Sequence, residues 1–296
     1  MSPKSPGYRP ILLLLLACAS ATPVGVGAAE WPDGRKIAVT LTFDLDADTL
    51  WWDDPDSMQG NPSSLSQGRY GPTVAVPKIL ALLERHGIRA TFFVPSWVAG
   101  QYPETLRAIA SAGHEIGAHG VKHVAPVTLS AAAEQAEFAE SVRVLEAITG
   151  KRPRGYRAPS WALSDITLEL AVDAGFTYSS NLMDSDVPYV HDSPPGLVEL
   201  PVSWILDDAP YFWFDEASWD KKIHSAAEVR AIWQEEFVAA YESGGYFDLT
   251  MHPQIIGRPA RVRMLDELVD WMSDFDGVWF ATCAEVANHV RSIEAR

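Results

Sequence analysis

Strand-like and helix-like segments alternate along most of the chain, and this alternation constrains the fold more than any other feature. Eight short apolar segments have the composition of buried strands, at residues 36–43, 89–94, 114–119, 155–159, 176–181, 196–202, 246–252 and 277–283. Segments of helical period lie between many of them, at residues 74–87, 103–113, 130–150 and 164–175. Each of these four ends in glycine, the residue best suited to a left-handed helix end. The sequence therefore predicts an α/β fold, close to a (β/α) barrel, whose functional site lies at the C-terminal ends of parallel strands.

Other features of the sequence indicate a single domain that is exported from the cytoplasm. Residues 1–29 have the features of a signal peptide, because Lys4 and Arg9 precede the apolar run ILLLLLACASA, which is too short to span a membrane comfortably. The protein is then periplasmic or secreted, although LLAC, ending at Cys18, also resembles a lipoprotein box and leaves lipid anchoring open. We expect a single domain over residues 30–296, with a core large enough to be stable without a disulfide. Cys283 would be the one cysteine left in it, and we expect that thiol to be buried as a small apolar residue.

The charge of the chain excludes some partners. The formal net charge is -16, so we expect no binding to nucleic acid or to an anionic membrane surface. A neutral ligand or a cationic product suits this charge better.

Two acidic residues follow the first predicted strand. In TLTFDLDAD, Asp44 and Asp46 are two residues apart, so the pleat of a strand would point both side chains to one face. Two close carboxylates repel each other and require a cation or a shared proton. The alternative, that both are loop acids capping a turn, stays open for this segment taken alone.

A histidine pair follows the third predicted strand. His119 and His123 in HGVKH have i,i+4 spacing, which on a helical turn would bring both imidazoles to one face. Together with Asp46 they form a set of two histidines and one carboxylate, which is typical of catalytic metal sites that keep a position open for water. His114 precedes the same strand, and we expect a structural role for it at the opposite end of the barrel.

Two further predicted strands end in residues that suit catalysis. GYRAPSW would bring Arg157 and Trp161 to the rim of the site, and DLTMHP would bring His252 to the end of a late strand. Taken singly, Arg157 and His252 could equally be packing residues. Together with the metal ligands they place complementary chemistry at several strand ends, which favours a catalytic metal site.

These residues resemble the polysaccharide deacetylase family of the NodB-homology type, carbohydrate esterase family 4. The common family pattern has adjacent acids in T-F-D-D, a metal-binding H-S-x-x-H, an Arg-x-Pro segment and a late Leu-x-His. The counterparts here are TFDLDAD, HGVKH, RAPSW and TMHP, and the similarity extends over about residues 36–282. The inserted Leu45, Gly120 in place of serine, and the segments LVELPVSWILDDAPYF and HPQIIGRP resemble the branch of peptidoglycan-deacetylase-like proteins and PuuE-type allantoinase.

The resemblance implies a distorted (β/α)7 barrel and a role for each motif residue. Asp44 would be the catalytic base, and Asp46, His119 and His123 would hold a divalent metal. Zinc is the expected ion, with cobalt, nickel or iron as alternatives. His252 would be the catalytic acid and Arg157 would orient or tune Asp44.

The expected substrate is an N-acetylated glycan, because many aromatic residues lie near the predicted rim. We expect it to contact the residues Trp51, Tyr70, Trp161, Asp207 and Arg258. The branch resemblance also suggests a homo-oligomer in which subunit contacts cover the site.

Three other functions compete with this one. The substrate could be a small cyclic amide or ureide, as for allantoinase-like and imidase-like relatives, although an export signal argues against it. A non-haem iron oxygenase also uses two histidines and a carboxylate, but usually on a different fold. A catalytically silent glycan-binding protein is the third.

Overall fold

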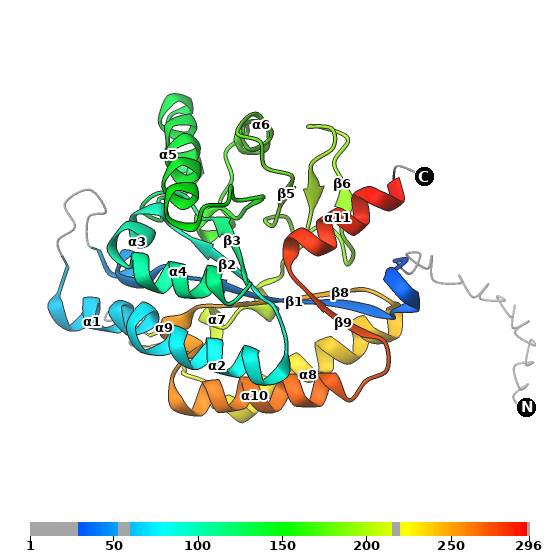
Figure 1. The fold of residues 1–296 in the computed structure, drawn as a ribbon. Coiled ribbons are helices and arrows are strands. Elements are labelled where there is room, and N and C mark those ends of the chain that lie inside the picture. The colour runs from blue at the N-terminus through cyan, green and yellow to red at the C-terminus, as the bar shows by residue number, and fades with distance from the viewer. Residues whose placement is uncertain (1–28, 53–59, 215–219, 295–296) are drawn as a thin grey trace, which may run out of the picture.

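The computed structural model describes residues 29–52, 60–214 and 220–294, and a parallel sheet lies at its centre (Figure 1). All but the last residue of the predicted signal peptide, including Cys18, therefore lies outside the described residues. The strands are β1 (Ile37–Asp44), β2 (Thr91–Val94), β3 (Glu115–Ala118), β4 (Gly155–Tyr156), β5 (Tyr178–Ser179), β6 (Tyr189–Val190), β7 (Val198–Glu199), β8 (Tyr246–Met251) and β9 (Val278–Ala281). All eight predicted strands are confirmed, and β6 is an addition. Their order is β6-β7-β5-β4-β3-β2-β1-β8, with β9 paired to β1.

Strand β1 pairs with three other strands and is buried along its whole length. One edge of β1 pairs with β8 from Ala38 to Phe43, and the other edge pairs first with β9 and then with β2. Apart from the antiparallel contact between β6 and β7, every pairing is parallel. A bridge between Asp207 and Thr250 bonds the far edge of β8 to the segment that follows β7. The sheet therefore curls into a distorted (β/α) barrel, as predicted, and the C-terminal ends of its strands meet at one end.

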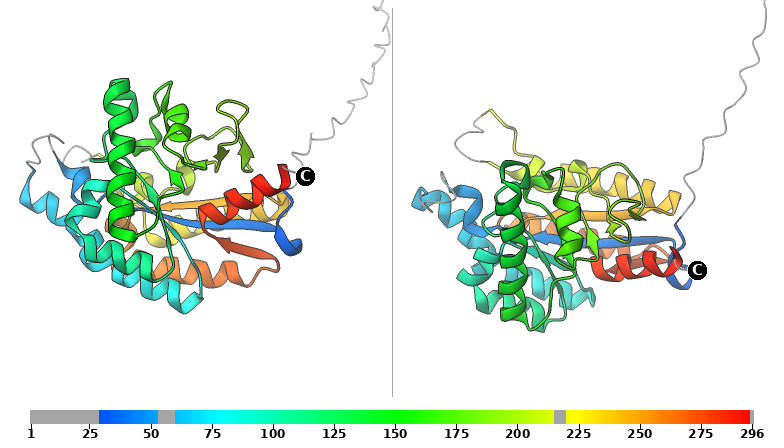
Figure 2. Two further views of the ribbon diagram at one scale, coloured as in Figure 1. Left: turned by 45° about the horizontal axis from the view of Figure 1, so that its top comes forward. Right: turned by 90° about the horizontal axis from the view of Figure 1, so that it is seen from above.

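Helices cover the outside of this curled sheet (Figure 2). They are α1 (Pro62–Tyr70), α2 (Val76–His86), α3 (Ser96–Gln101), α4 (Pro103–Ser111), α5 (Ala131–Thr149), α6 (Thr167–Asp173), α7 (Ala209–Phe212), α8 (Ala226–Ser243), α9 (Pro253–Ile256), α10 (Pro259–Ser273) and α11 (Cys283–Glu294). The four predicted helices correspond to α2, α4, α5 and α6. Their terminal glycines, Gly87, Gly113, Gly150 and Gly175, all have positive φ, between 63° and 86°, as expected for left-handed helix ends.

The core joins the inner face of the helices to the sheet. Phe43 and Phe92 stack at 4.9 Å between ring centroids, and Leu45 is buried in the same cluster. Cys283 is fully buried, as predicted. Over the residues that the structure describes, no helix is long and apolar enough to cross a membrane.

Candidate active site

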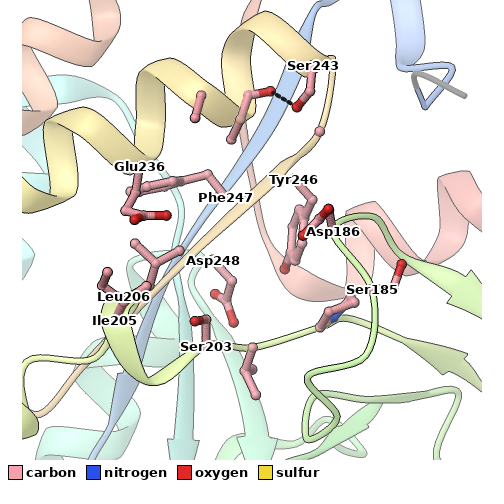
Figure 3. A pocket seen from close by; sticks show the side chains of 15 residues that line it. Ser185, Asp186, Ser203, Ile205, Leu206, Glu236, Ser243, Tyr246, Phe247 and Asp248 are labelled. Carbon is pink, nitrogen blue, oxygen red and sulfur yellow. Dashed lines mark hydrogen bonds between the residues drawn. The ribbon is translucent and has the colours of Figure 1, made fainter. Parts of the chain in front are cut away.

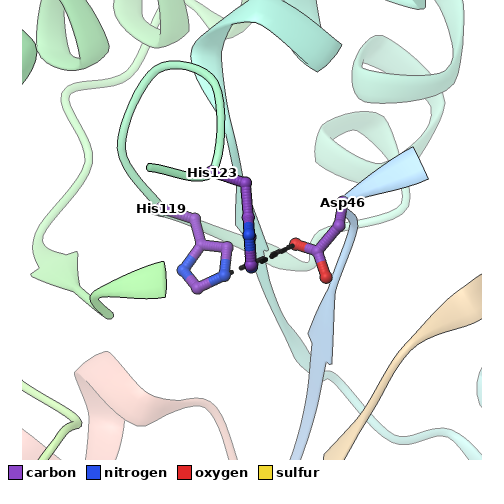
Figure 4. A group of neighbouring side chains, drawn as sticks. All are labelled: Asp46, His119 and His123. Atoms are coloured by element: carbon purple, nitrogen blue, oxygen red, sulfur yellow. Dashed lines mark ion pairs between the residues drawn. The ribbon is translucent and has the colours of Figure 1, made fainter. Parts of the chain in front are cut away.

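Asp46, His119 and His123 converge at the C-terminal end of the barrel (Figure 4). Asp46 follows the end of β1, and both histidines follow β3. The Nε2 atom of His119 lies 3.4 Å from Asp46 Oδ1, and that of His123 lies 3.9 Å from the same oxygen. The strand ends therefore bring the three predicted ligands together from segments more than 70 residues apart.

The histidine segment does not have the helical conformation that its spacing suggested. Residues 119–123 form a loop after β3, in which Gly120 and His123 have φ values of 71° and 60°. The Val121 N–H donates to Glu137 on α5 at 3.0 Å and fixes this loop. The helical turn was therefore wrong, because backbone torsions and a contact to α5 place the two rings, not a helix face.

The chemistry of this group fits a divalent metal. Asp46 is fully buried, and within the part of the chain that the structure describes neither of its carboxylate oxygens has a hydrogen-bond partner. The Nδ1 atom of His119 lies 2.7 Å from the carbonyl oxygen of Arg157, so it is the protonated nitrogen and Nε2 keeps a free lone pair. Burial raises the pKa of Asp46 to about 8 and lowers the pKa of His123 to about 3. A cation among these three side chains would remove the cost of burying the carboxylate.

Asp44 forms an ion pair with Arg157 beside the predicted metal ligands. The Nη1 atom of Arg157 donates to Asp44 Oδ1 at 3.0 Å, while Asp44 Oδ2 lies 3.8 Å from Nε2 of His119. Burial favours the protonated form of Asp44, but Arg157, with smaller contributions from His119 and His252, outweighs it, so the pKa of this carboxyl lies below its usual value. The sequence suggested that Arg157 lies at the rim of the site. This was wrong, because its side chain is fully buried beneath the site. The short strand β4 ends one residue before it, so its side chain points into the barrel.

Asp248 is a member of this network that the sequence analysis missed. Its Oδ2 accepts a hydrogen bond from Arg157 Nη2 at 2.7 Å, and its Oδ1 accepts one from Thr40 at 2.7 Å. Asp248 also lines a cavity of about 340 Å³ beside the N-terminal half of β8 (Figure 3). An aspartate within the apolar strand YFDLTM was the signal that could have revealed it. Arg157 is thus held between two buried carboxylates, of which only Asp44 faces the predicted ligands.

His252, at the end of β8, is held by Asp208. The Nδ1 atom of His252 lies 2.7 Å from Asp208 Oδ1, and its Nε2 lies 3.6 Å from Asp46 Oδ2. Burial disfavours the imidazolium, but Asp207 and Asp208 outweigh it and raise the pKa of His252 above its usual value. Asp207 also accepts a hydrogen bond from the Ala209 N–H at 2.7 Å, so it caps α7 as well as lining the site.

A cavity of about 200 Å³ opens onto these groups. Its lining includes Asp44, His119, His123, Asp207 and His252, together with an aromatic wall of Trp161, Trp204 and Trp213. Ser160 and Trp161 both have positive φ, 55° and 52°, a strained backbone that brings Trp161 to the cavity. We call this the active-site cavity.

The other predicted substrate contacts lie farther out. Trp51 stacks on Trp213 with ring centroids 4.6 Å apart, and both line a neighbouring cavity together with Arg258. Tyr70 lies behind Arg258, because its hydroxyl donates to Gly257 and its ring stacks on the guanidinium.

Comparisons with known proteins indicate the family of this chain. The polysaccharide deacetylase family model matches residues 69–179. A solved structure from Mycobacterium smegmatis, classed as a polysaccharide deacetylase, is 39% identical, covers 90% of this chain and 94% of its own, and has a TM-score of 0.85. A peptidoglycan deacetylase of Helicobacter pylori is 29% identical over 86% of this chain and 96% of its own length. PuuE allantoinase is similar in fold, with a TM-score of 0.79 at 23% identity over 90% of this chain and 94% of its own.

The fold and its relatives identify an enzyme, a hydrolase acting on carbon–nitrogen bonds other than peptide bonds. The chain belongs to the polysaccharide deacetylase family, with the NodB-type fold. The resemblance that the four motifs suggested is thereby confirmed.

Proposed function

We propose that this protein removes N-acetyl groups from an N-acetylated glycan in a metal-dependent reaction outside the cytoplasm. Asp46, His119 and His123 would hold the metal. When bound there, a divalent metal lowers the pKa of a water molecule and polarises an acyl carbonyl group.

The protein's own residues would move the protons. Asp44, kept ionised by Arg157, would take a proton from the attacking water. The water oxygen forms a bond to the acetyl carbon, and the carbon–nitrogen bond then breaks. His252, held in position by Asp208, would give a proton to the departing amine, so acetate and a free amino sugar are released.

One observation carries this proposal. A carboxylate paired with a cation and a histidine paired with an anion both lie beside the proposed metal ligands. Asp44 has a cationic partner in Arg157, and His252 has an anionic partner in Asp208. A base and an acid are therefore both present within about 4 Å of a metal ligand. The aromatic wall of the cavity suits the face of a sugar ring.

A small cyclic amide or ureide remains the second candidate substrate. The active-site cavity, at about 200 Å³, is large enough for one small ring or one acetamido group. The fold also resembles that of PuuE allantoinase. This candidate shares the catalytic residues and differs only in what enters the cavity.

One assay separates the two substrates. The mature protein is stripped with a chelator, reloaded with zinc, cobalt, nickel or iron(II), and incubated with N-acetylated oligosaccharides, allantoin and cyclic imides. We expect metal-dependent release of acetate from the oligosaccharides, without ring opening of the small amides. Ring opening of a small amide, without release of acetate from the oligosaccharides, would contradict the proposal and favour the second candidate substrate.

Two variants test the assigned roles. Asp44→Asn should lose at least about 100-fold in turnover yet keep the rise in melting temperature that the added metal causes. His119→Gln should lose that rise as well. The exposed Asp173→Asn is the matched control and should behave like the parent protein. A normal turnover number in Asp44→Asn would remove Asp44 from the mechanism.

A further inference from the structure

A second cavity adjoins the active-site cavity. It measures about 590 Å³, and Trp213 and Ile255 line both cavities. We call it the outer cavity. It lies where α9 and the start of α10 follow β8, so the chain reaches it directly after His252.

Two arginines line the outer cavity. Arg258 stacks on Tyr70 with its guanidinium carbon 3.8 Å from the ring centroid, and Arg261 stacks on Phe212 at 4.4 Å. Their hydrogen bonds to protein use Nε of Arg258 and Nη1 of Arg261 only, both to backbone carbonyls. Within residues 29–52, 60–214 and 220–294, neither guanidinium forms an ion pair with a carboxylate. The remaining N–H groups are therefore available to a ligand.

Buried polar atoms beside the arginines also have no partner. Gln254 is only 3% exposed, and among the described residues neither its amide nitrogen nor its amide oxygen has a hydrogen-bond partner. Within the same residues the buried Nε1 of Trp51 has no partner either. Leaving such atoms unpaired costs about 1–3 kcal/mol each. Both residues line the outer cavity, so this cost is located at its wall.

The described residues that line the outer cavity are opposite in charge to the chain as a whole. The formal net charge is -16, but the first turn of α10 has no acidic residue and follows Arg258, which is its N-cap. The positive end of this 15-residue helix adds to the field of the two guanidiniums. Among the residues that the structure describes, the lining of the outer cavity thus holds two cationic side chains and no carboxylate.

We propose that the outer cavity binds a carboxylate on the substrate. This inference rests on the proposed function and narrows it to an acidic N-acetylated glycan, whose acetamido group enters the active-site cavity. A planar carboxylate matches the fork of a guanidinium. The stacked rings of Trp51 and Trp213 would contact the apolar face of the sugar.

The test uses three N-acetylated tetrasaccharides of similar size. Chitotetraose is neutral, a tetramer of alternating N-acetylglucosamine and N-acetylmuramic acid carries lactyl carboxylates, and a hyaluronan tetramer carries uronate carboxylates. Binding is measured by calorimetry in the Asp44→Asn background, and KM and kcat are measured in the active enzyme. We expect at least one acidic glycan to bind about 10- to 100-fold more tightly than chitotetraose.

Variants assign this preference to the two arginines. Arg258→Gln/Arg261→Gln should abolish it by raising KM for the acidic glycan much more than KM for chitotetraose. Arg258→Lys/Arg261→Lys keeps the charge and the stacked stems, so it should retain part of the preference. Arg263→Gln on the same helix, whose side chain is 77% exposed, is the matched control and should retain all of it.

The outcomes separate the subsite from the reaction. Equal binding of neutral and acidic glycans by the parent protein would overturn the carboxylate site and leave deacetylation intact. A preference that survives in the double glutamine variant would overturn it as well. Tight binding of an acidic glycan without acetate release from any of the three would support the subsite and remove the proposed reaction.

Discussion

Arg157 shows how one side chain connects stability to chemistry. It is fully buried, yet its guanidinium donates to Asp44, Asp248, Thr42, Thr250 and Ser180. The ring of Phe93 lies against it, 4.3 Å from the guanidinium carbon. One cation thus compensates two buried carboxylates, one of which faces the active-site cavity.

Replacing this cation should cost both stability and activity. In Arg157→Met, Asp44 and Asp248 remain buried without their partner, so we expect the free energy of unfolding to fall by about 3–5 kcal/mol. Turnover should fall more than metal content, because Asp46, His119 and His123 are unchanged. Urea unfolding, kcat and bound metal per chain measure the three effects.

The control for this variant is Arg143→Met. Arg143 is on the surface of α5, with its side chain 68% exposed and paired to Glu140, so its loss should leave the free energy of unfolding almost unchanged. An Arg157→Met protein that loses its metal but regains normal turnover when the metal is restored would contradict the assigned role.

At the scale of the element, the two-residue strand β4 depends on a glycine. Gly155 pairs with Tyr178 of β5, and a Cβ atom at Gly155 would lie 1.8 Å from the ring of Tyr178. That ring is fully buried, and its hydroxyl donates to Glu115 at 2.9 Å. The absence of a side chain at Gly155 therefore allows β4 to pack closely enough to bring Arg157 into the barrel.

Gly155→Ala should disturb both the packing and the site. Tyr178 would have to move and lose its bond to Glu115, so we expect a loss of about 1–3 kcal/mol in unfolding free energy, together with a lower kcat. Gly100→Ala on α3 is the control, because a Cβ there meets no atom within 4 Å. It should be neutral or stabilising by up to about 1 kcal/mol. Equal melting temperatures for the two variants would refute this account of β4.

At the scale of the whole molecule, the two ends of the barrel differ in function. The proposed catalytic groups meet at the C-terminal ends of the strands, whereas His114 lies just before β3 at the other end, as predicted. The Ala90 N–H donates to its Nδ1 at 3.2 Å, so this nitrogen must be unprotonated in the folded protein. Burial, together with the charge of Arg89, lowers the pKa of His114 to about 4 from its ordinary 6.5.

This buried imidazole should make the fold sensitive to acid. The neutral form is favoured in the folded protein, so the contribution of His114 to stability is complete above pH 6.5 and is lost as the pH falls from 6.5 towards 4. We expect a loss of roughly 1–3 kcal/mol over this window. His114→Asn, which keeps an acceptor for Ala90, should lose less when urea unfolding is followed from pH 7 to 4.

The partly exposed His224→Asn serves as control and should follow the parent curve. Because other groups also titrate in this window, the informative quantity is the difference between parent and variant. Parallel curves for parent and His114→Asn would show that His114 does not contribute.

The sequence predicted much of the fold because its signals are local. Apolar segments, helical periods and terminal glycines each depend on neighbouring residues, so all eight predicted strands and the four predicted helices are present. The motif residues were predictable for a related reason. Asp44, Asp46, His119 and His252 each follow or end a strand, and parallel strands place their C-terminal ends together.

Long-range packing determined what the sequence could not show. The spacing of His119 and His123 suggested a helical turn, but left-handed torsions and a bond from Val121 to Glu137 on α5 set their geometry. The position of Arg157 beneath the site, between Asp44 and Asp248, depends on which strands are neighbours. The unpaired atoms of Gln254 could not be predicted, because a missing partner becomes visible only when every neighbour is in place.

The sequence alone therefore determined the class of fold and the residues available for chemistry, since strand periodicity and residue type are properties of the chain itself. Only the tertiary structure decided the partner of each charged group and the location of the cationic outer cavity. The physical reason is that charge pairing and burial act over a few ångströms in space, between residues that can be 200 positions apart in the chain.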